Sequence, residues 1–405
     1  MRRRFVAAIG LAISIVVVTA LLGQWPGSVA GEAQTTTSQS GNATNSALKT
    51  AWGEPDLQGI WANEYSTPLQ RPAQYANKEF FTEEERADLD KRRAGLRTFS
   101  DRVAPRGTEQ DVAGAYNAVF QSRRPTGRRT SLIVDPPDGR MPPVTAGVQK
   151  RRAELREFQL ALMQAVETCK TTHDAACAGV KHGPPSPRLA EQAPHYVTQF
   201  AFLNRADGPE DFGLGERCMS GNLPDFAGYR RIVQSPGAIT IFYDVGQGQG
   251  WSRTIPITGS PHLPSNVRQW WGDSRGRWEG NTLVVDVTNF SAKTDFQGSR
   301  ENLHLVERWT RTDAKTLEYA VTIEDPTTWA RPWTVKLELG RQPDQANRLY
   351  HEPRCHEGNA GMVGLLAGAR QEEAAFAAGR GPHPATKCRV ICGYGLTEDD
   401  DDPLR

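Results

Sequence analysis

Histidines and carboxylates share one stretch of the chain with most of its tryptophans. Four of the eight histidines lie between residues 262 and 356. Histidine titrates at about 6.5, and a nearby carboxylate fixes its tautomer and raises its basicity, so this mixture suits general acid–base catalysis. We predict that His304, His356, Glu307 and Asp325 carry the chemistry. Each could instead be an exposed or hydrogen-bonded structural residue, because neighbours in sequence need not be neighbours in space.

The segment 303–310 alternates polar and apolar residues and predicts a β-strand. Its period of two places His304 and Arg308 on one face and Glu307, beside Trp309, on the apolar face. A carboxylate among apolar side chains is costly unless it has a partner, and a charge-assisted pair with an arginine would supply one. The candidate partners are Arg275, Arg277 and Arg331. A structural ion pair and a catalytic carboxylate both remain open for Glu307.

Substrate-binding residues are predicted in the same region, because flat, amphipathic tryptophan rings suit sugars or aromatic ligands. The predicted set is His262, Asp273, Arg275, Trp278, Arg308, Trp329, Arg331, Trp333 and Asn359. Core packing explains most of the tryptophans equally well. Zinc would suit His304, His356 and one carboxylate by ligand type, but the chain has no HxH or HExxH spacing. We therefore predict no metal ligand, and the cofactor stays unknown.

The N-terminus has the order of a secretory signal. Arginines follow Met1, an apolar run extends from Phe5 to about Gly23, and small residues lead to Ala30. We predict a signal peptide over residues 1–30, a periplasmic or secreted location, and no stable membrane insertion after cleavage. An uncleaved membrane anchor is the alternative.

Six cysteines follow this signal, in a chain expected to enter an oxidising compartment where disulfides persist. The predicted pairs are Cys218 with Cys355 and Cys169 with Cys177, and Cys388 with Cys392 is a further candidate. Connectivity cannot be read from spacing alone. A bridge at Cys355 would hold His356 in place just before the last predicted helix, as a catalytic or binding side chain requires.

Turn signals recur at hairpin spacing through the second half of the chain, which predicts an antiparallel meander. The predicted strands are 238–245, 253–258, 282–287, 303–312, 316–323 and 334–339. Gly280 and Asn281 lie between two strands and tolerate a positive φ, which predicts a tight hairpin there. A sheet of this size must protect its edges, and we expect it to close into a barrel-like, lipocalin/calycin-like sheet in a predominantly β fold. Peripheral helices are predicted at 83–96, 149–169 and 362–378, the first opened by a capping box at Thr82.

The predicted organisation has five parts. The signal peptide, 1–30, precedes a flexible linker, 31–50, that is too poor in large apolar residues to fold. A mixed α/β region, 51–231, packs on an antiparallel β core, 232–359. A C-terminal helix and an acidic tail occupy 360–405.

Several motifs resemble a widespread group of exported bacterial proteins of unknown function. They are Gly272-Asp273-Ser274-Arg275-Gly276-Arg277-Trp278-Glu279-Gly280, Leu303-His304-Leu305-Val306-Glu307-Arg308, Asp325-Pro326-Thr327-Thr328-Trp329 and Cys355-His356-Glu357-Gly358-Asn359. The similarity extends over nearly the whole chain after the signal. It implies export and a shared fold, and it assigns no reaction.

We expect an exported protein that binds a small organic or carbohydrate-like molecule in a β-sheet pocket. The expected chemistry is His/carboxylate acid–base catalysis of a hydrolase, lyase or isomerase type, and the alternative is a non-catalytic periplasmic ligand carrier or envelope-binding protein. The near balance of 48 basic and 47 acidic residues gives no argument for a nucleic-acid partner. Oligomeric state is left open.

Overall fold

The computed structural model describes residues 48–95, 124–163, 206–212, 217–218, 222–226, 228–246, 249–343 and 360–384. By its contacts the chain divides into Met1–Ala43 and Thr44–Arg405, and the described residues belong to the second unit. The predicted signal peptide and nearly all of the predicted linker lie outside the described residues. His356, Asn359 and every cysteine except Cys218 also lie outside them.

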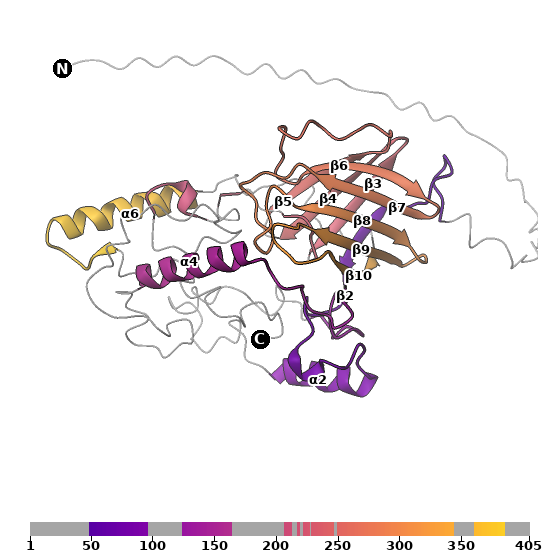
Figure 1. Ribbon diagram of the computed structural model, residues 1–405, viewed down its shortest axis with the longest axis horizontal. Coiled ribbons are helices and arrows are strands. Elements are labelled where there is room, and N and C mark those ends of the chain that lie inside the picture. The colour runs from indigo at the N-terminus through magenta and orange to yellow at the C-terminus, as the bar shows by residue number, and fades with distance from the viewer. Residues whose placement is uncertain are drawn as a thin grey trace, which may run out of the picture. The chain divides into compact units, whose positions relative to one another are not determined.

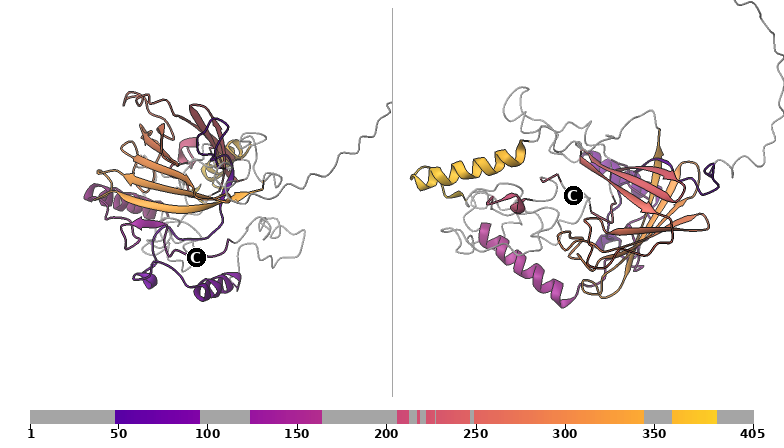
Figure 2. Two further views of the ribbon diagram at one scale, coloured as in Figure 1. Left: turned by 90° about the vertical axis from the view of Figure 1, so that its right-hand side faces the viewer. Right: turned by 90° about the horizontal axis from the view of Figure 1, so that it is seen from above.

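One antiparallel sheet contains all ten strands of the described residues (Figure 1). The strands are β1 (Gly59–Asn63), β2 (Ile133–Asp135), β3 (Tyr229–Ser235), β4 (Ala238–Gly246), β5 (Gln249–Pro256), β6 (Asp273–Glu279), β7 (Thr282–Thr288), β8 (His304–Arg311), β9 (Thr316–Glu324) and β10 (Trp333–Gln342). Their order is β5-β4-β3-β1-β10-β9-β8-β7-β6, and β2 also pairs with β10. The end strands β5 and β6 contact each other, so the sheet nearly closes (Figure 2). The predicted predominantly β, barrel-like fold is confirmed.

Alternation along each strand builds the interior of this barrel. In β8 the inward residues Leu305, Glu307 and Trp309 are buried and alternate with more exposed outward residues, as the period of two predicts. Leu283 and Val285 of β7 join them in one continuous hydrophobic core. All six predicted meander strands form, with boundaries that differ by a few residues.

The position of β1 differs from the predicted organisation. β1 lies in the middle of the sheet, where Trp61 pairs with Arg230 of β3 on one side and with Arg341 of β10 on the other. Without β1, the backbone N–H and C=O groups along one edge of β3 and one edge of β10 would have no strand to pair with, and unpaired strand edges are a liability in a sheet. A boundary at residue 232 therefore does not separate the sheet from the preceding region.

The tight turn between β6 and β7 forms where the sequence predicts it. Glu279 pairs with Thr282, so Gly280 and Asn281 make a two-residue loop. Gly280 has a φ of 61°, a left-handed conformation that glycine adopts without a steric penalty. This hairpin fixes the register between β6 and β7, and the register positions the polar residues of both strands.

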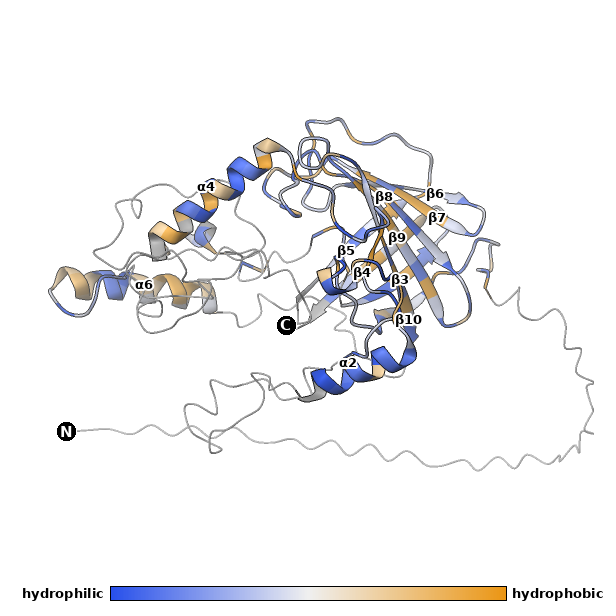
Figure 3. Ribbon diagram, turned by 60° about the horizontal axis from the view of Figure 1, so that its bottom comes forward, coloured by the Kyte–Doolittle hydropathy of each residue, from blue (hydrophilic) through white to orange (hydrophobic). Residues whose placement is uncertain are grey.

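Helices contribute little to the sheet itself. The described helices are η1 (Ala73–Tyr75), α2 (Glu83–Gly95), α4 (Ala146–Met163), η4 (Pro209–Asp211) and α6 (Gly361–Ala377). The predicted capping box at the start of α2 is confirmed, because Glu85 N donates to Thr82 Oγ1 and Thr82 N donates to Glu85 Oε2. Figure 3 shows α2 as mostly hydrophilic. In the part of the chain that is described, no helix is long and apolar enough to span a membrane.

Candidate functional site

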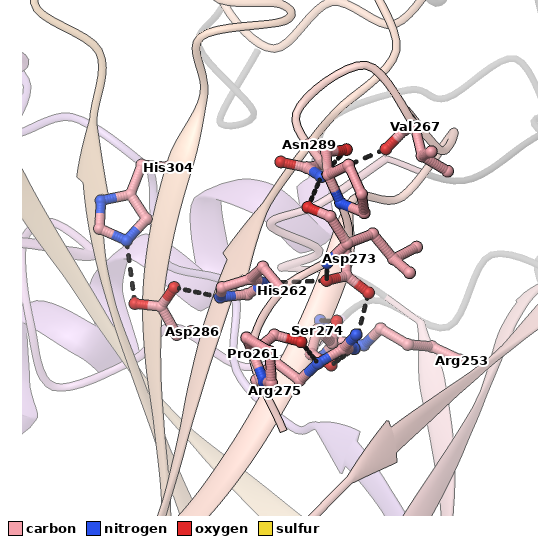
Figure 4. Close-up of polar contacts among 12 residues, drawn as sticks. Arg253, Pro261, His262, Val267, Asp273, Ser274, Arg275, Asp286, Asn289 and His304 are labelled. Atoms are coloured by element: carbon pink, nitrogen blue, oxygen red, sulfur yellow. Dashed lines mark hydrogen bonds and ion pairs between the residues drawn. The ribbon is translucent and has the colours of Figure 1, made fainter. Parts of the chain in front are cut away.

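Six ionisable side chains form a continuous line of contacts on the outer face of the barrel. Figure 4 labels five of them, all except Glu324. In order they are Glu324, His304, Asp286, His262, Asp273 and Arg275, and we call this set the His–Asp chain. Asp286 bridges the two histidines: its Oδ2 lies 3.0 Å from His304 Nε2 and its Oδ1 lies 2.8 Å from His262 Nε2. The line of contacts makes this the strongest candidate site among the described residues.

Each end of the His–Asp chain has its own partner. His262 Nδ1 lies 2.8 Å from Asp273 Oδ2, and Arg275 Nη1 donates to Asp273 Oδ1 at 2.6 Å. At the other end, His304 Nδ1 is 3.4 Å from Glu324 Oε2, a longer contact than the others. The side chains of His304 and Glu324 are 34% and 50% exposed, so this end is open to solvent.

Strand register explains why these residues meet. On β7 the residues flanking Asp286 point into the core, so Asp286 itself faces outward. Its cross-strand neighbours are Arg275 on β6 and Val306 on β8, and His304 is two residues from Val306 on the same face of β8. The hairpin at residues 280–281 and the β7–β8 pairing therefore bring three outward polar side chains together.

His262 comes from the loop between β5 and β6, which hydrogen bonds hold against the sheet. Leu263 N donates to Asp273 Oδ2 at 3.0 Å. Asn289, just after β7, has a φ of 58° and donates through Nδ2 to the carbonyl oxygens of Leu263, Pro264 and Val267. The loop thus places the His262 ring between two carboxylates.

The contacts of the His–Asp chain indicate which of its atoms donate hydrogen bonds and which accept them. Both neighbours of His262 are carboxylates, which only accept hydrogen bonds when ionised, so a ring nitrogen of His262 that carries a proton donates to one of them. Partial burial of Asp286 favours its neutral form, but the hydrogen bonds and charges of His304 and His262 outweigh burial and lower the pKa of Asp286. Asp286 is therefore the ionised acceptor that both histidines share.

This geometry leaves one nitrogen suited to proton transfer. His304 Nε2 lies 3.0 Å from Asp286 Oδ2, whereas Nδ1 lies at the exposed end of the His–Asp chain, 3.4 Å from Glu324 Oε2 and without a hydrogen bond in the described part of the chain. With the proton on Nε2, the lone pair of Nδ1 is therefore available. A carboxylate that fixes the tautomer of a histidine in this way makes the other nitrogen a better base. His304 can thus accept a proton from a bound molecule and return it, with Asp286 positioning the ring.

Glu307, predicted as catalytic, lies on the opposite face of β8. Its side chain is fully buried, and its Oε2 accepts from Arg253 Nη2 at 2.7 Å while its Oε1 accepts from the Tyr319 hydroxyl at 2.9 Å. The side chain of Arg253 is 4% exposed, so both charges are buried. Burial opposes the charge of Arg253, but the Glu307 carboxylate raises the pKa of Arg253. Glu307 and His304 therefore belong to different environments.

The predicted arginine partners of Glu307 were wrong. Arg275 and Arg277 lie on the outer face of β6, where Arg275 pairs with Asp273 and Arg277 pairs with Glu279, and Arg331 pairs with Asp135. Glu307 instead meets Arg253 on β5, because the sheet curls until β5 reaches the other side of the barrel interior. Curvature of this kind cannot be read from a strand pattern.

Asp325, predicted as catalytic, accepts hydrogen bonds from residues of its own loop and from Ser299. It is 3% exposed and accepts from Ser299 Oγ, Thr327 N and Oγ1, and Thr328 Oγ1. Burial favours its neutral form, but the hydroxyl and backbone donors together lower the pKa of Asp325. These hydrogen bonds all involve residues 299 and 325–328, and none reaches the His–Asp chain.

The remaining predicted binding residues divide between core and surface. Trp329 and Trp333 are buried and contact each other and Phe296, which makes them core residues. Trp278 is partly buried against the same core. Arg308 pairs with Glu279 on the outer face, four residues along β8 from His304. His262, Asp273 and Arg275 belong to the His–Asp chain.

Asp286 was not selected from the sequence. The available signal is a single carboxylate at an outward position of the apolar strand Leu283-Val284-Val285-Asp286-Val287. Among the described residues, no group of three or more histidine, cysteine or acidic side chains is arranged to hold a metal ion. The predicted roles of His356 and Asn359, and the cysteine pairings, fall on residues outside the described ranges.

Comparisons with known proteins add little to this geometry. No family model and no curated protein matches the chain. Among solved structures, the crystal structure of a mutant of the fluorescent protein UnaG matches with a TM-score of 0.18 and 13% sequence identity, covering 28% of this chain and 71% of that chain. The barrel architecture therefore rests on the strand order of this chain itself.

Proposed function

We propose that this protein is an acid–base enzyme acting on a small polar organic or carbohydrate-like molecule at the His–Asp chain. The observation that carries the proposal is Asp286, an ionised carboxylate held between His304 and His262 on the outer face of the barrel. His304 Nδ1 takes a proton from the bound molecule, and Asp286 stabilises the imidazolium that forms. The same nitrogen then returns the proton to the leaving group or to the neighbouring carbon.

The positions of Asp286 and His304 on rigid strands favour a catalytic role over that of an ordinary surface ion pair. Asp286 and His304 stand on adjacent strands, and Asp273 holds His262 from the other side. A site built on strands keeps its groups in place better than one built on a loop, which general acid–base catalysis requires. Hydrolysis, elimination and isomerisation are all compatible with one such proton-transfer group.

We further propose that the protein is exported to the periplasm or secreted, that residues 1–30 are its signal peptide, and that Cys218 and Cys355 are bridged. The order of charged, apolar and small residues at the N-terminus supports export. The resemblance of its motifs to exported bacterial proteins supports the same location. Intact-mass analysis of the exported protein, with and without reduction, tests both the cleavage and the bridges.

An activity screen with matched histidine variants tests the enzyme proposal. The exported protein is assayed against small esters and aryl glycosides for hydrolysis, β-hydroxy carbonyl compounds for elimination, and α-hydroxy ketones for isomerisation. For a substrate that is turned over, His304→Gln should lower kcat by about 100-fold or more, the scale of general acid–base groups. His383→Gln is the control and should leave kcat unchanged, because His383 is a partly buried histidine that follows α6 and packs on Phe376.

Two results would count against the proposal. One is turnover by His304→Gln equal to that of the unmodified protein, with the same melting temperature. The other is the absence of turnover across the whole panel, which would favour the non-catalytic carrier.

A further inference from the structure

The interior of the barrel holds buried hydrogen-bond donors that have no acceptor among the described residues. Nε and Nη1 of Arg230, Nε of Arg253 and Nε1 of Trp251 lie close together, and the Nε1 atoms of four other core tryptophans, Trp278, Trp309, Trp329 and Trp333, are further examples. Arg230 is fully buried, and Trp251 and Arg253 are 3% and 5% exposed. Buried polar groups in folded proteins are nearly always hydrogen-bonded, because an unsatisfied donor costs free energy. Several such donors in one place therefore point to something that accepts from them.

All three side chains gather around Tyr243 of β4. The guanidinium carbons of Arg230 and Arg253 each lie 5.8 Å from the centre of the Tyr243 ring, and the Trp251 ring stacks on it at 4.2 Å. The Tyr243 hydroxyl accepts from Arg253 Nη2 at 2.9 Å. Burial raises the pKa of Tyr243, so the hydroxyl keeps its own proton and can donate it.

The charges of the two arginines are compensated to different degrees. Arg253 has Glu307 Oε2 at 2.7 Å. For Arg230, the carboxylate oxygen Oδ2 of Asp225 lies 3.5 Å from Nη2, and the two other nitrogens face no acceptor in the described part of the chain. Arg230 is therefore where an additional negative charge would be best stabilised.

We propose that the barrel interior around Arg230, Tyr243 and Trp251 binds a small molecule through its carboxylate. Arg230, Trp251 and Tyr243 each have a donor to offer there, and a carboxylate supplies only acceptors, together with a second negative charge beside Arg230, whose ion pair with Asp225 is long at 3.5 Å. This site lies on the inner face of the sheet, whereas the His–Asp chain lies on the outer face, so it goes beyond the proposed acid–base function and does not depend on it.

We place the entrance to this site at the junction of β5 and β6. These strands are the two ends of the hydrogen-bonded order, so in the described chain no backbone ladder joins them. Side chains close the junction: Arg253 Nη1 donates to Ser274 Oγ at 3.5 Å, and Trp271 stacks on Trp251 at 4.4 Å. A small molecule can enter here by displacing side chains without breaking sheet hydrogen bonds.

Titration calorimetry and thermal unfolding of the exported protein test this site. Acetate, butyrate and benzoate are the probes, and acetamide and chloride distinguish a carboxylate from a neutral amide or a simple anion. We expect saturable heat and a rise in melting temperature with at least one carboxylate, because a ligand that binds the folded state stabilises it. Acetamide and chloride should give neither.

Variants then locate the binding. Arg230→Gln should raise Kd by about tenfold or more, since hydrogen bonds to charged groups contribute on this scale. Trp251→Phe removes one donor while keeping an aromatic ring beside Tyr243, and it should raise Kd severalfold. This variant tests the proposal if Arg230→Gln fails to fold. Arg277→Gln, an exposed arginine on the outer face of β6, is the matched control and should leave Kd unchanged.

Three outcomes overturn the proposal. The first is no saturable response of the unmodified protein to any carboxylate, which would mean that water satisfies the donors. The second is an equal response to acetamide or chloride. The third is an unchanged Kd in both interior variants.

Discussion

Replacing Glu307 by Gln removes one charge from a buried ion pair while keeping the size of the side chain. Glu307 is fully buried, accepts from Arg253 at 2.7 Å and from Tyr319 at 2.9 Å, and its arginine partner is 4% exposed. In Glu307→Gln the guanidinium stays buried without a counter-charge. Breaking a buried pair in this way costs about 3–5 kcal/mol of the free energy of unfolding, whereas most single substitutions cost about 1 kcal/mol.

Urea unfolding at neutral pH, followed by tryptophan fluorescence, measures this loss. Glu279→Gln is the matched control: Glu279 also pairs with arginines on this sheet, but its side chain is 41% exposed, and exposed pairs contribute about 0–1 kcal/mol. The double variant Arg253→Met with Glu307→Leu should recover much of the loss, because it leaves no buried charge. Equal effects of Glu307→Gln and Glu279→Gln would refute the reasoning.

Two further predictions concern packing and pH. A Cβ at Gly276 would lie 2.9 Å from Ile255 Cγ2 and 3.2 Å from Ile257 Cγ1, so Gly276→Ala should destabilise by about 1–3 kcal/mol through overpacking at the β5–β6 junction. Gly364→Ala in α6, where nothing lies within 4 Å, should instead raise the melting temperature. The pKa of Asp286 is lower in the folded state than in the unfolded state. The ionised carboxylate therefore stabilises the fold at pH values above its unfolded-state pKa, and this stabilisation is lost as the pH falls through its folded-state pKa. The stability difference between the unmodified protein and Asp286→Asn should therefore shrink from about pH 5 to below about pH 4, and a difference that grows on acidification would contradict this.

Local patterns predicted the parts of the fold that depend on neighbouring residues. Alternation placed His304 and Glu307 on opposite faces of β8, and the Gly280–Asn281 turn was predicted from residue type. The insertion of β1 between β3 and β10 was not predicted, because a five-residue strand carries no information about partners more than 160 residues away. Long-range pairing is decided by the closure of the whole sheet.

The candidate site was predicted in part for the same reason. His304 and His262 were selected by residue type, and the structure places both on one carboxylate. That carboxylate, Asp286, was missed because it is a single polar residue in an apolar strand. The partner of Glu307 was missed because Arg253 is 54 residues away and reaches it only across the curled sheet.

Long-range proton–nitrogen correlation spectra of isotope-labelled protein test the central claim without a known substrate. The account predicts that neutral His304 carries its proton on Nε2, bonded to Asp286, with Nδ1 unprotonated. In Asp286→Asn the nitrogen signals of both His304 and His262 should shift, while those of His383 should stay unchanged. Two results would contradict the proposed proton-transfer site: a neutral His304 protonated on Nδ1, or nitrogen signals of His304 and His262 that are unchanged in Asp286→Asn.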